Sequence, residues 1–324
     1  MPTVKKWKDA LKKPEHVESL DLDCTQLGRV RFPAHRVLPP EIGRFTALRR
    51  LRIRTRNLGE LCPELGTLPA LESLTIDAGE MVLQFHGALA ALPALKTLDL
   101  GSLGLTGPIA LPESLEVLSI HGNDGLDLAA WAPALAALPN LRELELNACL
   151  HGELPDAIGQ LRAVKALTLR DNGLIAVPDA LLALTGLQTL DLAGNQLADL
   201  PAGLGGLSGL EALQVHNNRM EAVPDTIRRL TGLRTLLLDH NPLREVPDWL
   251  GELRQLHTLG LSVTGLRDLP PSLLSLPLRR LYVDAPPAVV EHTRAHLPRC
   301  KVVSRSRADV DAEGGAWLRF LGKA

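Results

Sequence analysis

The chain has 324 residues, a formal net charge of −2, 45% hydrophobic residues and only 3% aromatic residues. This balance argues against a basic nucleic-acid-binding protein, and the lack of an apolar run of about 18 residues argues against a membrane span. The start, MPTVKKWKDALKK, lacks the apolar segment of a secretory signal, and the four cysteines form no CxxC pair, so we expect reduced thiols and a cytoplasmic location.

Residues 1–16 predict a helical cap at the N-terminus. Within VKKWKDALKK, Trp7 and Leu11 are four residues apart and would share one face of a helix. A stack of repeats exposes its leucines at each end, so such a helix would cover the first repeat.

The segment LRRLRIRTRN, residues 48–57, contains five arginines. Its alternation predicts a strand that buries Leu51 and Ile53 and directs Arg50, Arg52 and Arg54 to the opposite face.

The strands predicted on either side of this segment carry acidic residues. Arg52 would lie beside Asp21, and Arg54 would lie between Asp23 and Asp77. Lateral pairs of opposite charge stabilise by about 0.2–1 kcal/mol each. We therefore interpret the run mainly as a solvated, self-paired strand face. A site for an acidic peptide or another anion is the alternative, and nucleic acid is the least favoured partner.

A 23-residue repeat is clearest from residue 161 to residue 270. LRAVKALTLRDNGLIAVPDAL at 161 is followed by LTGLQTLDLAGNQLADLPAGL at 184, and the same pattern returns at 207 and 230. About twelve repeats would occupy residues 17–285. Their strand motifs start at Val17, Leu48, Leu71, Leu95, Leu115, Leu141, Val164, Leu187, Leu210, Leu233, Leu256 and Leu278, with a half-repeat at Leu297.

The leucine alternation predicts a short strand in each repeat, and stacking repeats about 4.8 Å apart would build a parallel sheet over a leucine core. An asparagine follows where the chain leaves the strand, at Asn123, Asn172, Asn195, Asn218 and Asn241. Its amide can both donate to and accept from buried backbone groups, so we expect an asparagine ladder. Other residues take this place in earlier repeats (Arg56, Gly79, Leu103, Cys149), which predicts a less regular N-terminal half.

The repeat pattern resembles the leucine-rich repeat family, especially the 23-residue Ras-group repeats with Leu-Pro on the outer side. LTGPIALPESL and LHGELPDAIGQL are closer to plant-type repeats. The resemblance implies an α/β fold, a right-handed solenoid shaped as a horseshoe or arc. A parallel sheet would line its concave face, and short helices or 3-10 turns its convex face.

Residues 286–324 would hold the half-repeat and a C-terminal cap. PAVVEHTRAHL and GGAWLRFLGKA both have the apolar spacing of a covering segment. The second of these, within residues 304–324, is alternatively a tail that recruits a partner.

A partner would bind the concave strand positions that the leucines leave free. Leu237 is apolar at a position predicted to face solvent, and Tyr282 is the only tyrosine. Together with polar neighbours they would form an apolar spot with a polar rim, as in binding hot spots, although an isolated exposed leucine is common. The predicted partner-binding residues are Arg170, Gln214, His216, Leu237, Asp239, His240 and Tyr282.

These observations favour a non-enzymatic scaffold that binds a protein partner in intracellular signalling or regulation. We expect a bacterial protein that is monomeric. We expect no cofactor, metal, nucleic acid or membrane to be involved. A secreted bacterial effector that acts on a host or competitor protein is the alternative. An enzyme or metal-binding protein ranks third: His216, Asp239 and His240 are zinc-type ligands, but neighbouring strand residues diverge, and no GxxxxGK[ST], HExxH or GxSxG motif occurs.

Overall fold

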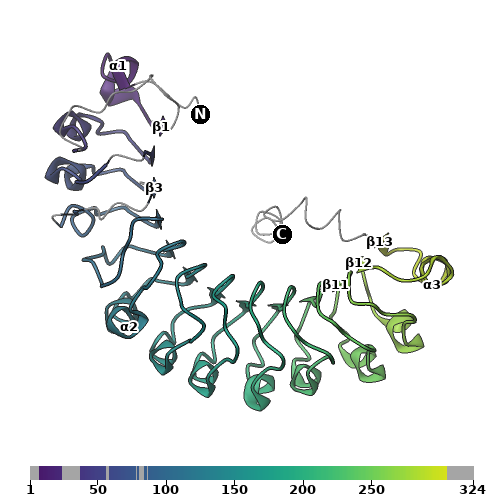
Figure 1. The fold of residues 1–324 in the computed structure, drawn as a ribbon. Coiled ribbons are helices and arrows are strands. Elements are labelled where there is room, and N and C mark those ends of the chain that lie inside the picture. Colours follow the sequence, from purple (N-terminus) through teal and green to yellow (C-terminus); the bar gives the residue numbers. More distant parts are fainter. Residues whose placement is uncertain are drawn as a thin grey trace. The chain divides into compact units, whose positions relative to one another are not determined.

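A computed structural model describes residues 7–23, 37–55, 58–77, 79, 84–85 and 87–304. The chain forms two compact units, residues 1–172 and residues 173–324. In each unit, parallel strands follow one another in chain order, and helices or 3-10 turns connect them on the other side (Figure 1). The repeat pattern therefore predicts the architecture within each unit.

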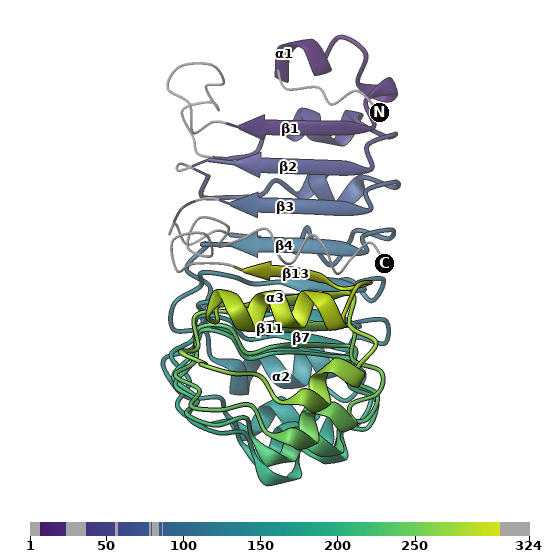
Figure 2. The ribbon, with the colours of Figure 1, turned by 90° about the vertical axis from the view of Figure 1, so that its right-hand side faces the viewer.

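The described residues of the first unit form seven strands, of which β1 to β4 are seen running in one direction in Figure 2. They are β1 (Ser19–Asp23), β2 (Arg50–Arg54), β3 (Ser73–Asp77), β4 (Thr97–Gly101), β5 (Val117–Ser119), β6 (Glu143–Glu145) and β7 (Ala166–Thr168). The helical segments of this unit are α1 (Trp7–Ala10), η1 (Pro14–His16), η2 (Pro40–Arg44), η3 (Pro63–Thr67), α2 (Leu128–Ala136) and η4 (Asp156–Gln160).

Residues 173–304 of the second unit form six strands, and this unit is the more regular of the two. Its strands are β8 (Thr189–Asp191), β9 (Ala212–Gln214), β10 (Thr235–Leu237), β11 (Thr258–Leu261), β12 (Arg280–Val283) and β13 (Lys301–Ser304). Its helical segments are η5 (Asp179–Ala183), η6 (Ala202–Gly206), η7 (Asp225–Arg229), η8 (Asp248–Glu252), η9 (Pro271–Ser275) and α3 (Pro287–His296).

All twelve predicted strands are present, each beginning two residues after the first residue of its motif; β1, for example, begins at Ser19 after Val17. The half-repeat at Leu297 supplies β13. On the outer side, a proline precedes most 3-10 turns, and an aspartate opens several of them, as at Pro178 and Asp179. Proline has no N–H to leave unpaired there, and the aspartate suits the positive end of the turn.

The helix α2 is one of the short helices expected on this side, where most other connections are 3-10 turns. Asp127 caps it, because its Oδ1 accepts a hydrogen bond from the Ala130 N–H at 3.0 Å. The spacing of Leu128, Trp131 and Leu135 buries one face, and Trp131 is fully buried. Trp131 thus fills core space on this side, where a 3-10 turn such as η5 buries a leucine.

At the N-terminus, α1 is a single turn in which the half-buried Trp7 ring lies 5.5 Å from the Phe45 ring. Leu11 follows the helix and is also half-buried. Of the expected C-terminal cap, PAVVEHTRAHL forms α3, which buries Val290 and Thr293. The segment GGAWLRFLGKA lies outside the described residues.

The predicted asparagines make the expected backbone bonds. Asn195, for example, donates from Nδ2 to the carbonyl of Leu192 at 2.8 Å, and its Oδ1 accepts from the Leu174 N–H at 3.0 Å. All five are buried. These amides satisfy backbone groups that the turn away from the strand would otherwise leave unpaired.

Cys149 takes the asparagine position of its repeat and replaces part of the amide's role. Its thiol contacts the Ile120 carbonyl at 2.5 Å, and its N–H donates to Asn172 Oδ1 at 2.8 Å. Burial raises the pKa of the Cys149 thiol to about 11, and burial likewise raises the pKa of Cys62 to about 11. Neither thiol is therefore ionised near neutral pH.

Iodoacetamide at about pH 8 should leave Cys62 and Cys149 unmodified in the native protein, because only thiolate reacts and both thiols are buried. Cys300 is half-buried and should react faster. Peptide mass mapping before and after urea unfolding measures this. Native labelling of Cys149 at the rate of Cys300 would show that the first unit opens at this position.

The residue before each of the five buried asparagines adopts a left-handed backbone. Glycine, aspartate or asparagine suits this conformation, and Asn217 has φ +55°. Val263 occupies the same place with φ +55°. A β-branched side chain is poorly accommodated there, at a cost of about 1–2 kcal/mol.

The substitution Val263→Asn should therefore raise the free energy of unfolding by about 1 kcal/mol. Urea denaturation followed by circular dichroism measures the change. The reverse change, Asn217→Val, is the matched control and should destabilise by a similar amount. A neutral Val263→Asn would mean that packing of the half-buried valine offsets the backbone strain.

Candidate partner-binding surface

The predicted binding residues of the second unit lie side by side on neighbouring strands. The register pairs Gln214 with Leu237, Leu237 with Gly260, and Gly260 with Tyr282. The alternation that buries Leu213 and Leu236 below the sheet places these residues on its other face. One row from β9 to β12 therefore carries three of the predicted side chains.

The prediction that Leu237 and Tyr282 form an exposed apolar spot is wrong. Leu237 is only 3% exposed, Gln214 is 1% exposed and Tyr282 is 8% exposed. Gly260 explains this packing, because a Cβ placed there would meet the Asp239 carboxylate and would lie 3.0 Å from Leu237 Cδ2. Neighbouring side chains close over the glycine, so the centre of the row is packed before any partner arrives.

The polar residues at the strand exits form the accessible part of this surface. His216, Asp239 and His240 are all half-buried. Asp239 Oδ1 accepts the Ser262 N–H at 2.8 Å, and the His240 N–H donates to the Ser262 carbonyl at 2.8 Å. The Ser262 N–H therefore holds the Asp239 carboxylate in place, and backbone bonds place His240 at the same strand exit.

Further exposed polar residues continue this surface on β12 and just beyond it. Arg280 opens the strand and Asp284 follows it, and both are exposed. Sequence reasoning omitted them from the predicted set, although each falls on a solvent-facing position of the strand motif. We call the group His216, Asp239, His240, Arg280 and Asp284 the polar rim.

Arg170 lies in the first unit, immediately after β7, and is half-buried. Its N–H donates to Asn147 Oδ1 at 2.9 Å. It is therefore not part of the row in the second unit.

The arginine row has the predicted register: Arg52 pairs with Asp21, and Arg54 pairs with Asp23 and Asp77. Arg50 and Arg52 are exposed and Arg54 is half-buried. A salt bridge also joins Arg49 to Glu72 at 2.5 Å. The register is consistent with a solvated face flanked by acids, and the use of this row as an anion site stays a prediction.

A second polar group in the first unit was not among the predicted site residues. His121 Nδ1 lies 3.2 Å from Asp99 Oδ1 and 3.3 Å from Ser119 Oγ. Its ring covers Gly101 of β4, which has no side chain to block it. The hydrogen bond to Asp99 raises the pKa of His121, although burial acts in the opposite direction. The glycine in a strand motif is the sequence signal for this arrangement.

The His121–Asp99 pair should make stability depend on pH. Because the folded-state pKa of His121 is raised, its contribution is fully present below about pH 6.5 and is lost as the pH rises through the raised value. The stability advantage of the wild type over His121→Gln should thus be larger at about pH 5.5 than at about pH 8.5.

Urea denaturation at both pH values measures the difference. The control is His151→Gln, because His151 pairs with Asp124 on the exposed surface, where such a pair contributes little. An equal His121→Gln effect at both pH values would contradict the prediction.

No helix within the described ranges is long and apolar enough to cross a membrane. Over the same part of the chain, no three His, Cys, Asp or Glu side chains gather as a metal site would require.

Comparison with known proteins identifies the repeat. A family model described as a leucine-rich repeat region matches residues 112–239. No curated protein matches the sequence significantly. Among solved structures, the chain is similar to a leucine-rich repeat protein of Leptospira interrogans, with 22% identity and a TM-score of 0.53 over 94% of this chain and 100% of that chain.

Two further structures have a similar fold. An internalin of Listeria monocytogenes shows 19% identity and a TM-score of 0.63, covering 90% of this chain and 80% of its own. A chain in the Toll–Spätzle complex of Drosophila shows 20% identity and a TM-score of 0.63; the match covers 94% of this chain but only 45% of that chain. At these identities the similarity establishes the fold alone.

Proposed function

We propose that this chain, as a leucine-rich repeat protein, is a non-enzymatic module that binds a protein partner through its second unit. Domains of this family generally bind proteins, and the similar fold in the Toll–Spätzle complex belongs to an assembly with a protein ligand. The polar rim and the packed row beside it are the proposed contact surface.

The observation that carries this proposal is the fixed placement of the polar rim. His216 follows β9, Asp239 and His240 follow the neighbouring strand β10, and Asp239 Oδ1 accepts the Ser262 N–H at 2.8 Å. Groups that are already ordered lose little conformational entropy on binding. The packed side chains of Leu237 and Tyr282 would then form a firm surface beside the polar rim, and the polar rim would select the partner.

Affinity capture from the native cell, with crosslinking and mass spectrometry, tests the proposal. The variant His216→Ser/Arg280→Glu changes exposed or half-buried rim positions and leaves the packed row intact. The control Arg229→Glu makes the same charge change on the exposed side of η7. We expect a partner that the wild type and the control retain and the rim variant loses. A partner retained by all three would contradict the proposed surface.

We further propose that the protein is a cytoplasmic scaffold in signalling or regulation, with a secreted effector as the alternative. Free buried thiols at Cys62 and Cys149 suit a reducing compartment. Fractionation of the native cells with tagged protein separates the two roles. Recovery from the medium, or from a target cell, would support the effector instead.

A further inference from the structure

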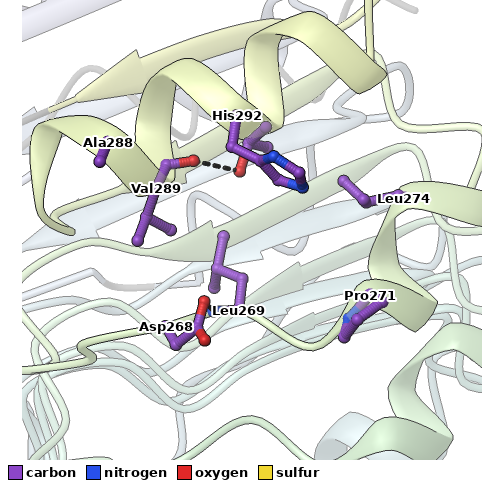
Figure 3. Close-up of a pocket in the computed structure, with 8 residues that line it drawn as sticks. Asp268, Leu269, Pro271, Leu274, Ala288, Val289 and His292 are labelled. Carbon is purple, nitrogen blue, oxygen red and sulfur yellow. Dashed lines mark hydrogen bonds between the residues drawn. The ribbon is translucent and has the colours of Figure 1, made fainter.

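A shallow apolar groove lies on the outer side of the second unit, between η9 and α3. Its volume is about 330 Å³. Figure 3 shows Leu269 below the helix, Val289 on the helix, and Leu274 beside His292. Asp268 stands at the edge of the groove, opposite α3 (Figure 3). The groove thus has apolar walls and one carboxylate at its margin.

The groove follows from the residue at the fourth place of η9, where some other outer turns have a glycine that lets the next turn approach closely. The fourth residue of η8 is Gly251, and a Cβ there would lie 2.6 Å from Ser272 Cβ of η9. The equivalent residue of η9 is Leu274, which is half-buried. In η5 the same place is taken by Leu182, but Gly203 of the next turn makes room for it.

The helix α3, with the sequence PAVVEHTRAH, contains no glycine that would accommodate Leu274. It presents Ala288, Val289 and His292 toward the groove instead. The gap between η9 and α3 therefore follows from these side chains, and it leaves apolar surface that nothing in the described part of the second unit covers.

We propose that the apolar segment Trp317–Leu321 of the same chain, WLRFL, occupies this groove and covers the outer face of the last repeat. This inference is independent of the proposed partner surface, which lies on the strand side. The segment begins thirteen residues after Ser304, where β13 ends. Thirteen residues span at most about 45 Å, whereas the ten residues of α3 extend over only about 15 Å.

The chemistry of the segment matches the groove. Trp317, Leu318, Phe320 and Leu321 are the only large apolar residues between residues 311 and 324, and they gain by leaving water. Arg319 lies among them, and the groove offers Asp268 at its edge. An arginine flanked by apolar residues fits an apolar groove with a carboxylate margin.

The fluorescence of Trp317 in the full chain tests this proposal. Subtracting the spectrum of Trp317→Phe from that of the wild type removes the signal of the other three tryptophans. We expect blue-shifted emission for Trp317 and protection from acrylamide at low protein concentration. Leu274→Glu should shift the emission to longer wavelength and abolish the protection, whereas the matched variant Leu182→Glu should preserve both.

A second variant, altered in the tail alone, keeps the test valid if Leu274→Glu unfolds the protein. Leu318→Ser/Phe320→Ser leaves the described residues unaltered and should also expose Trp317. An exposed Trp317 in the wild type, or protection that survives both Leu274→Glu and the tail variant, would overturn the proposal. Protection that appears only as protein concentration rises would assign the groove to a second copy and would overturn the intramolecular contact.

Discussion

Replacing Leu190 with alanine should lower the free energy of unfolding by about 2–5 kcal/mol. Leu190 is the central residue of β8, is 0% exposed, and pairs in register with Leu213 of β9. Alanine would leave a cavity between stacked repeats, because the backbone on either side is held by the sheet and cannot collapse into it.

Urea denaturation followed by circular dichroism measures this loss, with the linear dependence on urea used to compare variants. Repeat proteins unfold with strong coupling between neighbours, so amide exchange at Leu213 should report the same destabilisation. The control is Ile175→Ala in the same unit, because Ile175 is 68% exposed and should change stability by about 0.5 kcal/mol or less. A Leu190→Ala effect as small as the control would mean that the buried face of β8 is misassigned.

The strands were predictable because the local sequence pattern of each repeat is sufficient to indicate its strand. The period-two alternation around Leu190 recurs in every repeat, and the asparagine positions mark each strand exit. The helix α2 was also within reach of the sequence, since Asp127 precedes Leu128, Trp131 and Leu135 at helical spacing. It belongs to the short helices or 3-10 turns expected on the outer side.

The candidate site was only partly predictable, because burial on the open face of a sheet depends on the neighbouring repeat. Strand position alone assigns Leu237 to solvent, but its exposure is decided by Gly260 one strand away and by the direction of the Asp239 side chain. His121 over Gly101 follows the same rule. A glycine on this face leaves space that an adjacent side chain can fill. Which neighbouring side chain fills it can be seen only in the structure.

Asn218 makes buried hydrogen bonds that an apolar side chain in its place could not make. Asn218 donates from Nδ2 to the carbonyls of Leu192 at 3.0 Å and Val215 at 3.0 Å, and its Oδ1 accepts from the Leu197 N–H at 2.9 Å. It is buried, so water cannot substitute for the amide. Removing it leaves the buried Leu197 N–H without its partner, whereas the Leu192 and Val215 carbonyls keep hydrogen bonds from Asn195 and Asn241.

Asn218→Ala should therefore lower the free energy of unfolding by about 1–3 kcal/mol, which is the cost of one unsatisfied buried group, here the Leu197 N–H. Urea denaturation measures it, and Asn140→Ala is the control, because the Asn140 amide bonds Glu113 on the exposed surface. Asn218→Asp should also be destabilising, because a carboxylate cannot donate to the Leu192 and Val215 carbonyls and would be buried beside them. Its loss should shrink as the pH falls and the carboxyl group takes up a proton. A tolerated aspartate at neutral pH would show that acceptance from Leu197 alone holds this turn.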